Sequence, residues 1–220
     1  MTFTLITALP SPFGRKVAIV MLEKGITFDV RYDVPWGDKT CTPDYSPLEQ
    51  LPILIGADGE TVYDSAYICD WLEVRFPELA LLPQDPAARL ATMKRRMLGE
   101  RLMEVAQALI FELHRPEPSA PWVDRQTRKV RGALAELDRL YDRAPNRAGA
   151  VPDLGDIAVA TTLLGIEFAL TSGLSPDVAV LHWRGSHPAL AKAVSALETR
   201  PSFERTQPRM MDVDLQATVA

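Results

Sequence analysis

The chain has 220 residues, enough for one large domain or two small ones, and a hydrophobic share of 47% is enough for a packed core. The formal net charge of −5 argues against a nucleic-acid partner, because phosphate binding requires a concentrated basic face. Cys41 and Cys69 are too few for a disulfide framework and lack the pattern of a zinc site, so no metal is expected.

The first part of the chain predicts a β-α-β unit. Residues 2–7 and 27–32 are rich in Thr, Phe, Val and Ile, which is typical of short strands. Between them, Ser11 stands where a helix N-cap would stand, and Pro12 suits the first helical position because it has no backbone donor. Apolar residues at helical spacing follow, and Gly25 marks the end of that helix.

A second pair of strands and a helix complete this α/β layer. Residues 53–55 and 61–63 are predicted strands, and the Asp-Gly pair between them is a hairpin signal. Residues 65–76 form a predicted helix that ends before a proline. The α/β domain is therefore expected to cover residues 1–77.

The second half of the chain predicts helices only. A proline-rich linker over residues 78–86 precedes it, and apolar residues then recur at helical spacing. The predicted helices cover residues 87–113, 123–143, 154–171 and 188–199. The third of them is apolar nearly all round, which indicates a central, buried helix. We expect an all-helical domain over residues 87–208 and a loose tail over residues 209–220.

The segment 87–113 illustrates how the helical signal arises. Leu90, Met93 and Met97 lie at positions i, i+3 and i+7, and further apolar residues continue the stripe to Leu109. A stripe of this kind is typical of a helix with one face on a core.

No targeting or membrane-spanning segment is predicted. The sequence begins without a positively charged stretch and a long apolar core, so no signal peptide is expected. No window of apolar residues reaches the length that a membrane span needs. The expectation is a soluble, cytoplasmic protein that makes no contact with a membrane.

Three short segments of the α/β domain could form one ligand site. Ser11 opens a helix, where unpaired backbone donors and the helix dipole favour an anion. Gln50-Leu51-Pro52 precedes a strand, and proline is tolerated there because it cannot donate into a ladder. Asp64-Ser65 joins an acidic side chain to a hydroxyl and free backbone donors, a combination that could hold the ammonium and carboxylate of an amino acid. Taken singly, each segment is also an ordinary cap or strand start.

Together and in this order, the segments resemble the glutathione transferase superfamily. "SPFGRKV" resembles the start of the first helix in bacterial members, and "CPF" of the omega class with serine in place of cysteine. "SPLEQLPIL" resembles the stretch that ends in the cis-proline of the superfamily, and Gln50-Leu51-Pro52 falls on the Gln-Val-Pro of zeta-class members. "VYDSAYICDWLE" resembles the Glu-Ser or Gln-Ser motif, although Asp64 is shorter than the usual Glu. "PDLGDIAVA" resembles the capping box of the central helix, with Asp153 at the N-cap and Asp156 at the third helical position.

The resemblance implies a thioredoxin-like N-terminal domain, an all-α C-terminal domain and glutathione as co-substrate. Asp64 and Ser65 would contact its γ-glutamyl end, and the backbone of Leu51 would pair with its cysteinyl backbone beside cis-Pro52. Gln50 would reach its glycyl end, where Lys39 is a further candidate. Its sulfur would lie at Ser11, which would activate the thiol by donating a hydrogen bond. The alternative is that Ser11 only caps the helix and a backbone donor activates the sulfur.

The implied function is conjugation of the glutathione thiolate to a small electrophile, as in detoxification, by a homodimer. Phe13, His114, Arg115 and Trp122 are candidates for the wall of the second-substrate site. A glutathione-dependent isomerase or dehalogenase, or a non-catalytic regulatory module on the same fold, are the alternatives. Thiol–disulfide exchange is disfavoured, because Ser11 and Gly14 occupy both positions where a redox motif would place sulfur. The sequence does not identify the electrophile.

Overall fold

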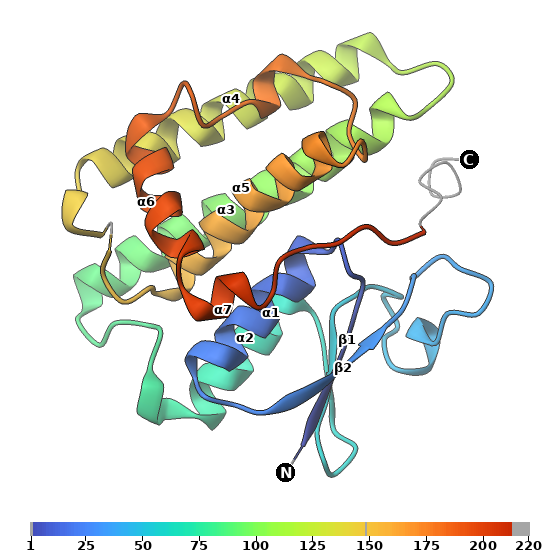
Figure 1. Cartoon of the computed structure of the whole chain (residues 1–220), viewed down its shortest axis with the longest axis vertical. Coiled ribbons are helices and arrows are strands. Elements are labelled where there is room, and N and C mark those ends of the chain that lie inside the picture. Colours follow the sequence, from blue (N-terminus) through green and yellow to red (C-terminus); the bar gives the residue numbers. More distant parts are fainter. Residues whose placement is uncertain (1, 148, 213–220) are drawn as a thin grey trace.

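A four-stranded mixed sheet forms the first layer of the protein, whose computed structural model describes residues 2–147 and 149–212 (Figure 1). The strands are β1 (Phe3–Thr7), β2 (Phe28–Tyr32), β3 (Ile53–Ile55) and β4 (Thr61–Val62), in the spatial order β2-β1-β3-β4. β1 and β2 are parallel, whereas β3 is antiparallel to both β1 and β4. Parallel strands need a crossover, which α1 (Pro12–Glu23) supplies, so the predicted β-α-β unit is confirmed.

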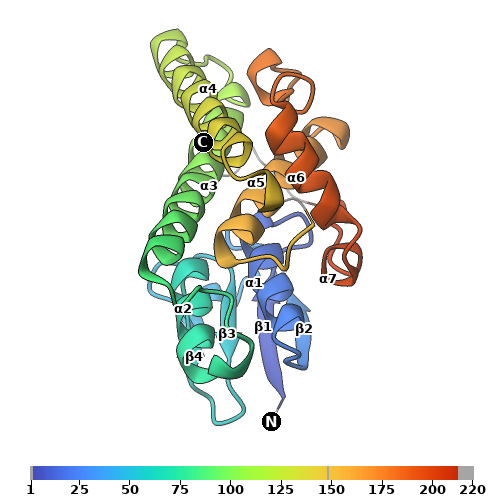
Figure 2. The same cartoon turned by 90° about the vertical axis from the view of Figure 1, so that its left-hand side faces the viewer.

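The two faces of the sheet are covered differently. Leu5 and Leu54 pack with α1 and α2 (Ser65–Arg75), which lie side by side in Figure 2. Ile6 and Ile53 point to the opposite face and pack with Cys41 in the segment that follows β2. That segment contains one short 3-10 turn, η1 (Thr42–Asp44). The alternation along each strand follows from its period of two.

Helices form the second layer, above the sheet layer in Figure 1. They are α3 (Pro86–Leu113), α4 (Ala120–Asp142), α5 (Leu154–Thr171), α6 (Pro188–Glu198) and α7 (Pro201–Glu204), with 3-10 turns η2 (Pro77–Leu79), η3 (Pro145–Arg147) and η4 (Ala179–Leu181) between elements. α5 packs against both α3 and α1, and its residues from Leu154 to Ile166 are all buried. The predicted central helix is therefore confirmed, and α1 joins the two layers.

The expectation that no apolar segment is as long as a membrane span is wrong for α5. Its 18 residues are long and apolar enough to cross a membrane by length and composition. Most of them are instead buried inside the protein, between α3, α1 and α6. A core helix surrounded by other helices has the same composition as a span, because both lack an aqueous face.

α3 is a helix as predicted, but its first apolar residues do not face the core. Leu90, Met93 and Met97 are 68%, 49% and 48% exposed. The buried face in this part of α3 carries Thr92 and Arg95 instead, and it continues to Gly99, Leu102, Ala106 and Leu109. A Cβ on Gly99 would lie 2.9 Å from the backbone nitrogen of Val159, so α5 can approach α3 only where α3 has no side chain.

Polar side chains occupy that face because they hold the start of α5. Asp153 Oδ1 accepts a hydrogen bond from Asp156 N at 2.9 Å, and Asp156 Oδ2 accepts one from Asp153 N at 3.2 Å. This is the predicted capping box. Thr92 Oγ1 donates to Asp153 Oδ2 at 2.7 Å, and the Tyr141 hydroxyl donates to Asp156 Oδ1 at 2.9 Å. Burial raises the pKa of Tyr141 well above its usual value, so this hydroxyl keeps its proton.

The limits of the two domains stay predictions. The residues assigned to the linker hold the last two residues of η2 and the first residue of α3. α4 begins at Ala120, three residues before its predicted start. In the predicted tail, residues 213–220 lie outside the described residues.

Candidate functional site

A cavity of about 510 Å³ lies between the sheet layer and helices α3 and α5. All three predicted segments contribute to its lining. The predicted site residues that line it are Ser11, Phe13, Gln50, Leu51, Pro52, Asp64 and Ser65. Segments that are more than 50 residues apart in the sequence therefore meet at one place.

Ser11 caps α1 at the edge of this cavity. Its backbone is extended, and its Oγ accepts a hydrogen bond from Gly14 N at 3.2 Å. The hydroxyl proton remains free to be donated to a further acceptor. A Cβ on Gly14 would lie 1.7 Å from the Thr7 hydroxyl, so glycine is required for α1 to begin this close to β1. The close approach sets the position of Ser11.

Leu51 presents an unpaired backbone to the cavity. The Leu51–Pro52 peptide bond is cis, as the resemblance implies, and the ladder of β3 begins only at Ile53. Within the described part of the chain, neither the N–H nor the C=O of Leu51 takes part in a hydrogen bond. An extended peptide can therefore pair with this residue as an added strand would.

Asp64 and Ser65 form the start of α2 on the same cavity. Asp64 Oδ1 accepts hydrogen bonds from Ala66 N at 2.8 Å and Tyr67 N at 3.2 Å, which makes Asp64 the N-cap. Its Oδ2 makes no hydrogen bond to any described residue. The Ser65 backbone N–H and hydroxyl lie at the positive end of the helix. The pair can hold a cation on one side and a carboxylate on the other.

The opposite wall of the cavity is mostly apolar, with Glu104 and Gln107 of α3 as polar members, and sequence reasoning missed all of it except Phe13. It consists mainly of Met103, Ile110 and Phe111 from α3, Phe168 and Ala169 from α5, and Trp36 and Leu174 from loops. The rings of Trp36 and Phe111 meet edge to face, with centroids 6.5 Å apart. The spacing of residues 103, 107, 110 and 111 could have shown that they share one helical face. It could not have shown what that face covers.

His114, Arg115 and Trp122 are not among the residues that line the cavity. His114 Nε2 lies 3.0 Å from the carbonyl oxygen of Leu174 and ties the end of α3 to the loop after α5. Trp122 lies on α4 and is 44% exposed. Lys39 is exposed and also lies outside the lining.

Neither cysteine is placed to act as a nucleophile here. Burial raises the pKa of Cys69 to about 11. Burial, followed by the hydrogen bond to Asp33, also raises the pKa of Cys41, whose Sγ lies 3.0 Å from Asp33 Oδ2. Neither residue lines the cavity. A reactive sulfur in this cavity would therefore have to come from a ligand.

Comparison with known proteins finds one family along the chain. Residues 10–75 match the family model described as "Glutathione S-transferase, N-terminal domain". Over 206 residues the chain is 30% identical to the "Uncharacterized GST-like protein YibF" of Escherichia coli (strain K12). The match covers 93% of this chain and 98% of that relative.

Solved structures of similar proteins extend over both layers. One is a glutathione S-transferase from Methylobacterium radiotolerans JCM 2831 in complex with glutathione sulfonate, at 37% identity and a TM-score of 0.87. The match covers 97% of this chain and 98% of that one. Another is a glutathione S-transferase from Methylobacillus flagellatus KT with GSH bound, at 31% identity and a TM-score of 0.82, covering 94% of this chain and all of that one.

Proposed function

The chain belongs to the glutathione transferase superfamily, and from this premise we propose that it binds glutathione in the cavity at Ser11 and transfers its thiolate to a small electrophile. The observation that carries the proposal is the lining of that cavity. A helix-capping hydroxyl, an unpaired peptide backbone and a site for an ammonium and a carboxylate lie on one wall. The opposite wall is mostly apolar.

Glutathione fits the polar wall in one direction. Its γ-glutamyl ammonium binds Asp64 Oδ2, and its γ-glutamyl carboxylate binds Ser65 at the start of α2. Its cysteinyl backbone pairs with Leu51, and Gln50 binds the glycyl end. This orientation brings the sulfur to Ser11 and the start of α1.

Ser11 acts by stabilising the thiolate. A free thiol has a pKa of about 8.5, and lowering it by about two units requires roughly 2.7 kcal/mol of preferential stabilisation. A hydrogen bond to a charged group contributes roughly 1.5–3 kcal/mol, and the helix N-terminus adds about 0.3–1 kcal/mol. The two contributions suffice without a general base. The sulfur then forms a bond to an electrophilic carbon of the second substrate, and a leaving group such as chloride departs from that carbon with its electron pair.

The electrophile lies against the apolar wall. Phe111 and Trp36 offer ring edges and faces to an aromatic or other apolar substrate. Burial of such a substrate against this wall holds it next to the sulfur without a specific polar contact. This makes a transferase with a role in detoxification the function that the cavity supports best.

We also propose a homodimer. Leu90, Met93 and Met97 form an exposed apolar stripe on α3, and members of this family are often dimers. An apolar face of this kind is stabilised when another subunit covers it. The cytoplasmic location expected from the sequence stays a prediction.

Calorimetric titration and conjugation kinetics test the function together. Glutathione should bind the wild-type protein, and the protein should accelerate conjugation of 1-chloro-2,4-dinitrobenzene at neutral pH. Binding without any conjugation or glutathione-dependent conversion across a panel of electrophiles would favour the regulatory module. Absence of binding at millimolar glutathione would contradict the proposal.

A further inference from the structure

The strand β2 forms one edge of the sheet, and its outer side is free. The spatial order of the strands is β2-β1-β3-β4, and Figure 2 shows β2 and β4 at opposite sides of the sheet. In the part of the chain that the structure describes, β2 pairs with β1 alone. The outward backbone groups of an edge strand have no partner, so they can pair with a further strand.

One hydrogen bond shows which backbone groups of β2 face outward. Asp33, directly after the strand, donates its backbone N–H to the carbonyl oxygen of Thr7 at 3.0 Å, so this amide faces β1. Successive residues of a strand direct their N–H and C=O groups alternately to its two sides. The odd-numbered residues of β2 therefore bond to β1. The residues whose N–H and C=O groups face the free edge are Phe28, Val30 and Tyr32.

β2 lacks the features that usually prevent an edge strand from pairing. The opposite edge strand, β4, has only two residues, and such shortness is one of those features. β2 has five residues in an unbroken register with β1, so it contains no bulge. Its sequence FDVRY contains no proline, glycine or lysine, and its aromatic and β-branched residues favour an extended strand. Val30 and Tyr32 are 42% and 49% exposed, so this edge is open to another strand.

The two charged residues of β2 have opposite signs. Asp29 and Arg31 are exposed and lie two residues apart, so they share one face of the strand. Neither forms an ion pair with a described residue. The Arg31 guanidinium lies over the ring of Tyr45, 6.0 Å from its centroid. Charges on an edge strand usually discourage pairing, but two opposite charges can neutralise each other across a two-fold axis.

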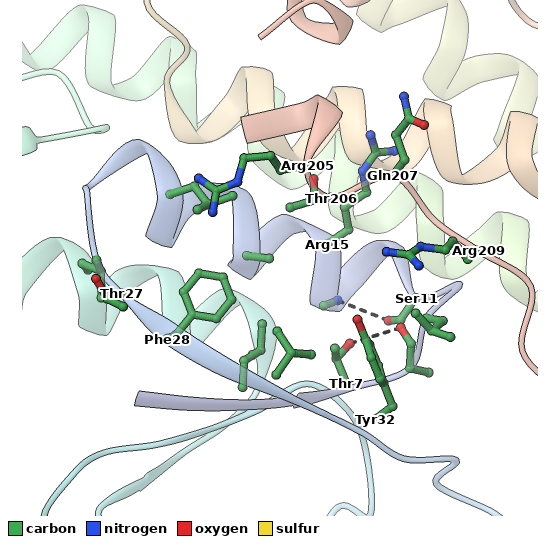
Figure 3. Close-up of a pocket in the computed structure, with 18 of the residues that line it drawn as sticks. Thr7, Ser11, Arg15, Thr27, Phe28, Tyr32, Arg205, Thr206, Gln207 and Arg209 are labelled. Atoms are coloured by element: carbon green, nitrogen blue, oxygen red, sulfur yellow. Dashed lines mark hydrogen bonds between the residues drawn. The ribbon is translucent and has the colours of Figure 1, made fainter. Parts of the chain in front are cut away.

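A second copy of β2, placed antiparallel about a two-fold axis at Val30, complements the first copy at every position. The outward backbone groups then form the hydrogen-bonded pairs, and each pair exchanges both of its N–H···O bonds. Phe28 lies opposite Tyr32 of the second copy, and Figure 3 shows both rings on the side of β2 that faces α1. On the other face, Asp29 lies opposite Arg31 of the second copy. Directly opposite aromatic pairs and ion pairs both stabilise a sheet.

We propose that β2 is an interaction surface for a second copy of this chain, which pairs with it as an antiparallel strand centred on Val30 and joins the two sheets into one. The surface is distinct from the apolar stripe on α3 and does not depend on the function proposed above. Five paired residues bury less area than a standard interface, so the association is weak. It adds to the α3 dimer only at concentrations well above micromolar.

Sedimentation equilibrium of the full chain, from micromolar to nearly millimolar concentration, tests the proposal. At low ionic strength, where the ion pairs are least screened, the average mass of the wild type should rise above its micromolar value as the concentration increases. A mass that keeps its micromolar value over the whole range would overturn the proposal.

Charge reversal at the paired positions tests the register. Asp29→Arg places arginines opposite each other, and Arg31→Asp places aspartates opposite each other. Each single variant should weaken the association at least about tenfold, although the two change the net charge in opposite directions. The double variant keeps the net charge of the wild type and restores both ion pairs, so its association should return to about the wild-type strength. Equal association of the single and double variants would overturn the proposal.

A mixture of the two single variants tests the same register without a new substitution. A copy with Asp29→Arg presents two arginines to a copy with Arg31→Asp, which presents two aspartates. The mixture should therefore associate at concentrations where neither variant does so alone. Absence of association in the mixture would contradict the pairing, and wild-type association of either variant alone would mean that another surface is used.

Val30→Pro tests the hydrogen bonds of the free edge. Because the N–H of Val30 faces outward, proline removes a donor there and none from the ladder with β1. The variant should lose the rise in mass while circular dichroism shows that its helices and strands are retained. A folded Val30→Pro variant that associates as strongly as the wild type would overturn the proposal. The charge-reversal variants, at exposed positions, decide the question if this variant does not fold.

Discussion

Ser11 Oγ and Gly14 N are joined by a 3.2 Å hydrogen bond that caps α1 where the helix borders the cavity. The cap uses a lone pair of the hydroxyl oxygen and leaves its proton available. One side chain can thus stabilise the helix and a ligand's sulfur at the same time. When Ser11 is replaced, loss of the cap lowers the stability of the protein, whereas loss of the hydrogen bond to the sulfur raises the pKa of the bound thiol. The two roles can therefore be measured separately.

Asp64→Asn should weaken glutathione binding while leaving the fold intact. Asparagine caps a helix about as well as aspartate, so the free energy of unfolding should change by less than about 0.5 kcal/mol. The charge that binds the γ-glutamyl ammonium is lost, and the dissociation constant should rise roughly tenfold. Titration calorimetry measures the dissociation constant.

A ligand control assigns the effect to that ammonium. Desamino-glutathione lacks the group, and it should bind the wild type and Asp64→Asn with equal affinity. If the substitution weakens both ligands to the same extent, Asp64 acts on the shape of the site and not on the ammonium.

Asp156→Ala should destabilise the protein by roughly 3–5 kcal/mol, because it breaks a buried network that contains charged partners. Asp156 accepts from Asp153 N and the Tyr141 hydroxyl, and it also pairs with Arg147. The denaturant midpoint measures the loss. Asp85→Ala, which removes the exposed N-cap of α3, is the control and should cost about 1 kcal/mol. Equal losses would mean that the network adds nothing to the cap.

Glu23→Gln should reduce the free energy of unfolding at neutral pH and make it fall less steeply as the pH is lowered. Partial burial of Glu23 opposes its ionisation, but hydrogen bonds from Arg200 and Ser202 outweigh this and lower its pKa. Its stabilising effect is therefore present above the unfolded pKa of about 4.3 and is lost as the pH falls through the lower folded value.

The expected readout is a difference between two stability curves. At pH 7 the variant should be less stable by roughly 1.5–3 kcal/mol, and the difference should shrink as the pH falls below about 4. Urea unfolding at a series of pH values measures both. A gap that stays constant down to acid pH would show that the glutamate contributes through packing and not through its charge.

Met93→Glu with Met97→Glu should dissociate the proposed dimer. Two charges on the exposed stripe of α3 cannot be buried against a second subunit without a large penalty. Sedimentation at micromolar concentration should give twice the 24.4 kDa of one chain for the wild type and 24.4 kDa for the variant. Met210→Glu, at an exposed methionine that lies after α7, should remain dimeric. A monomeric wild type would rule out this assembly.

Most elements of the fold could be predicted because their signals are local. Periods of two and 3.6 residues, a proline at the first helical position and the Asp153–Asp156 capping box all lie within single segments. The orientation of α3 could not be predicted in the same way. Its apolar stripe begins with Leu90 and Met93, yet the buried face carries Thr92 and Arg95, because α5 supplies their partners.

In the candidate site, too, only the features with local sequence signals could be predicted. Its polar wall is carried by caps and a proline, which short motifs encode, so Ser11, Leu51 and Asp64 could be named from the sequence. Its apolar wall is made by side chains such as Phe111 and Phe168, which look like core residues of any helix.

Titration of bound glutathione in the wild type and in Ser11→Ala shows most directly whether Ser11 activates the thiol. The ultraviolet absorbance of the thiolate, followed against pH, gives the pKa of the bound thiol. Ser11→Ala should raise that pKa by about one to two units and lower the conjugation rate at neutral pH accordingly. It should also cost about 0.5–2 kcal/mol of stability as a lost cap, which Asp85→Ala matches at a cap outside the cavity. If the thiolate titrates at the same pH in the wild type and in Ser11→Ala, Ser11 is only a cap and does not activate the thiol.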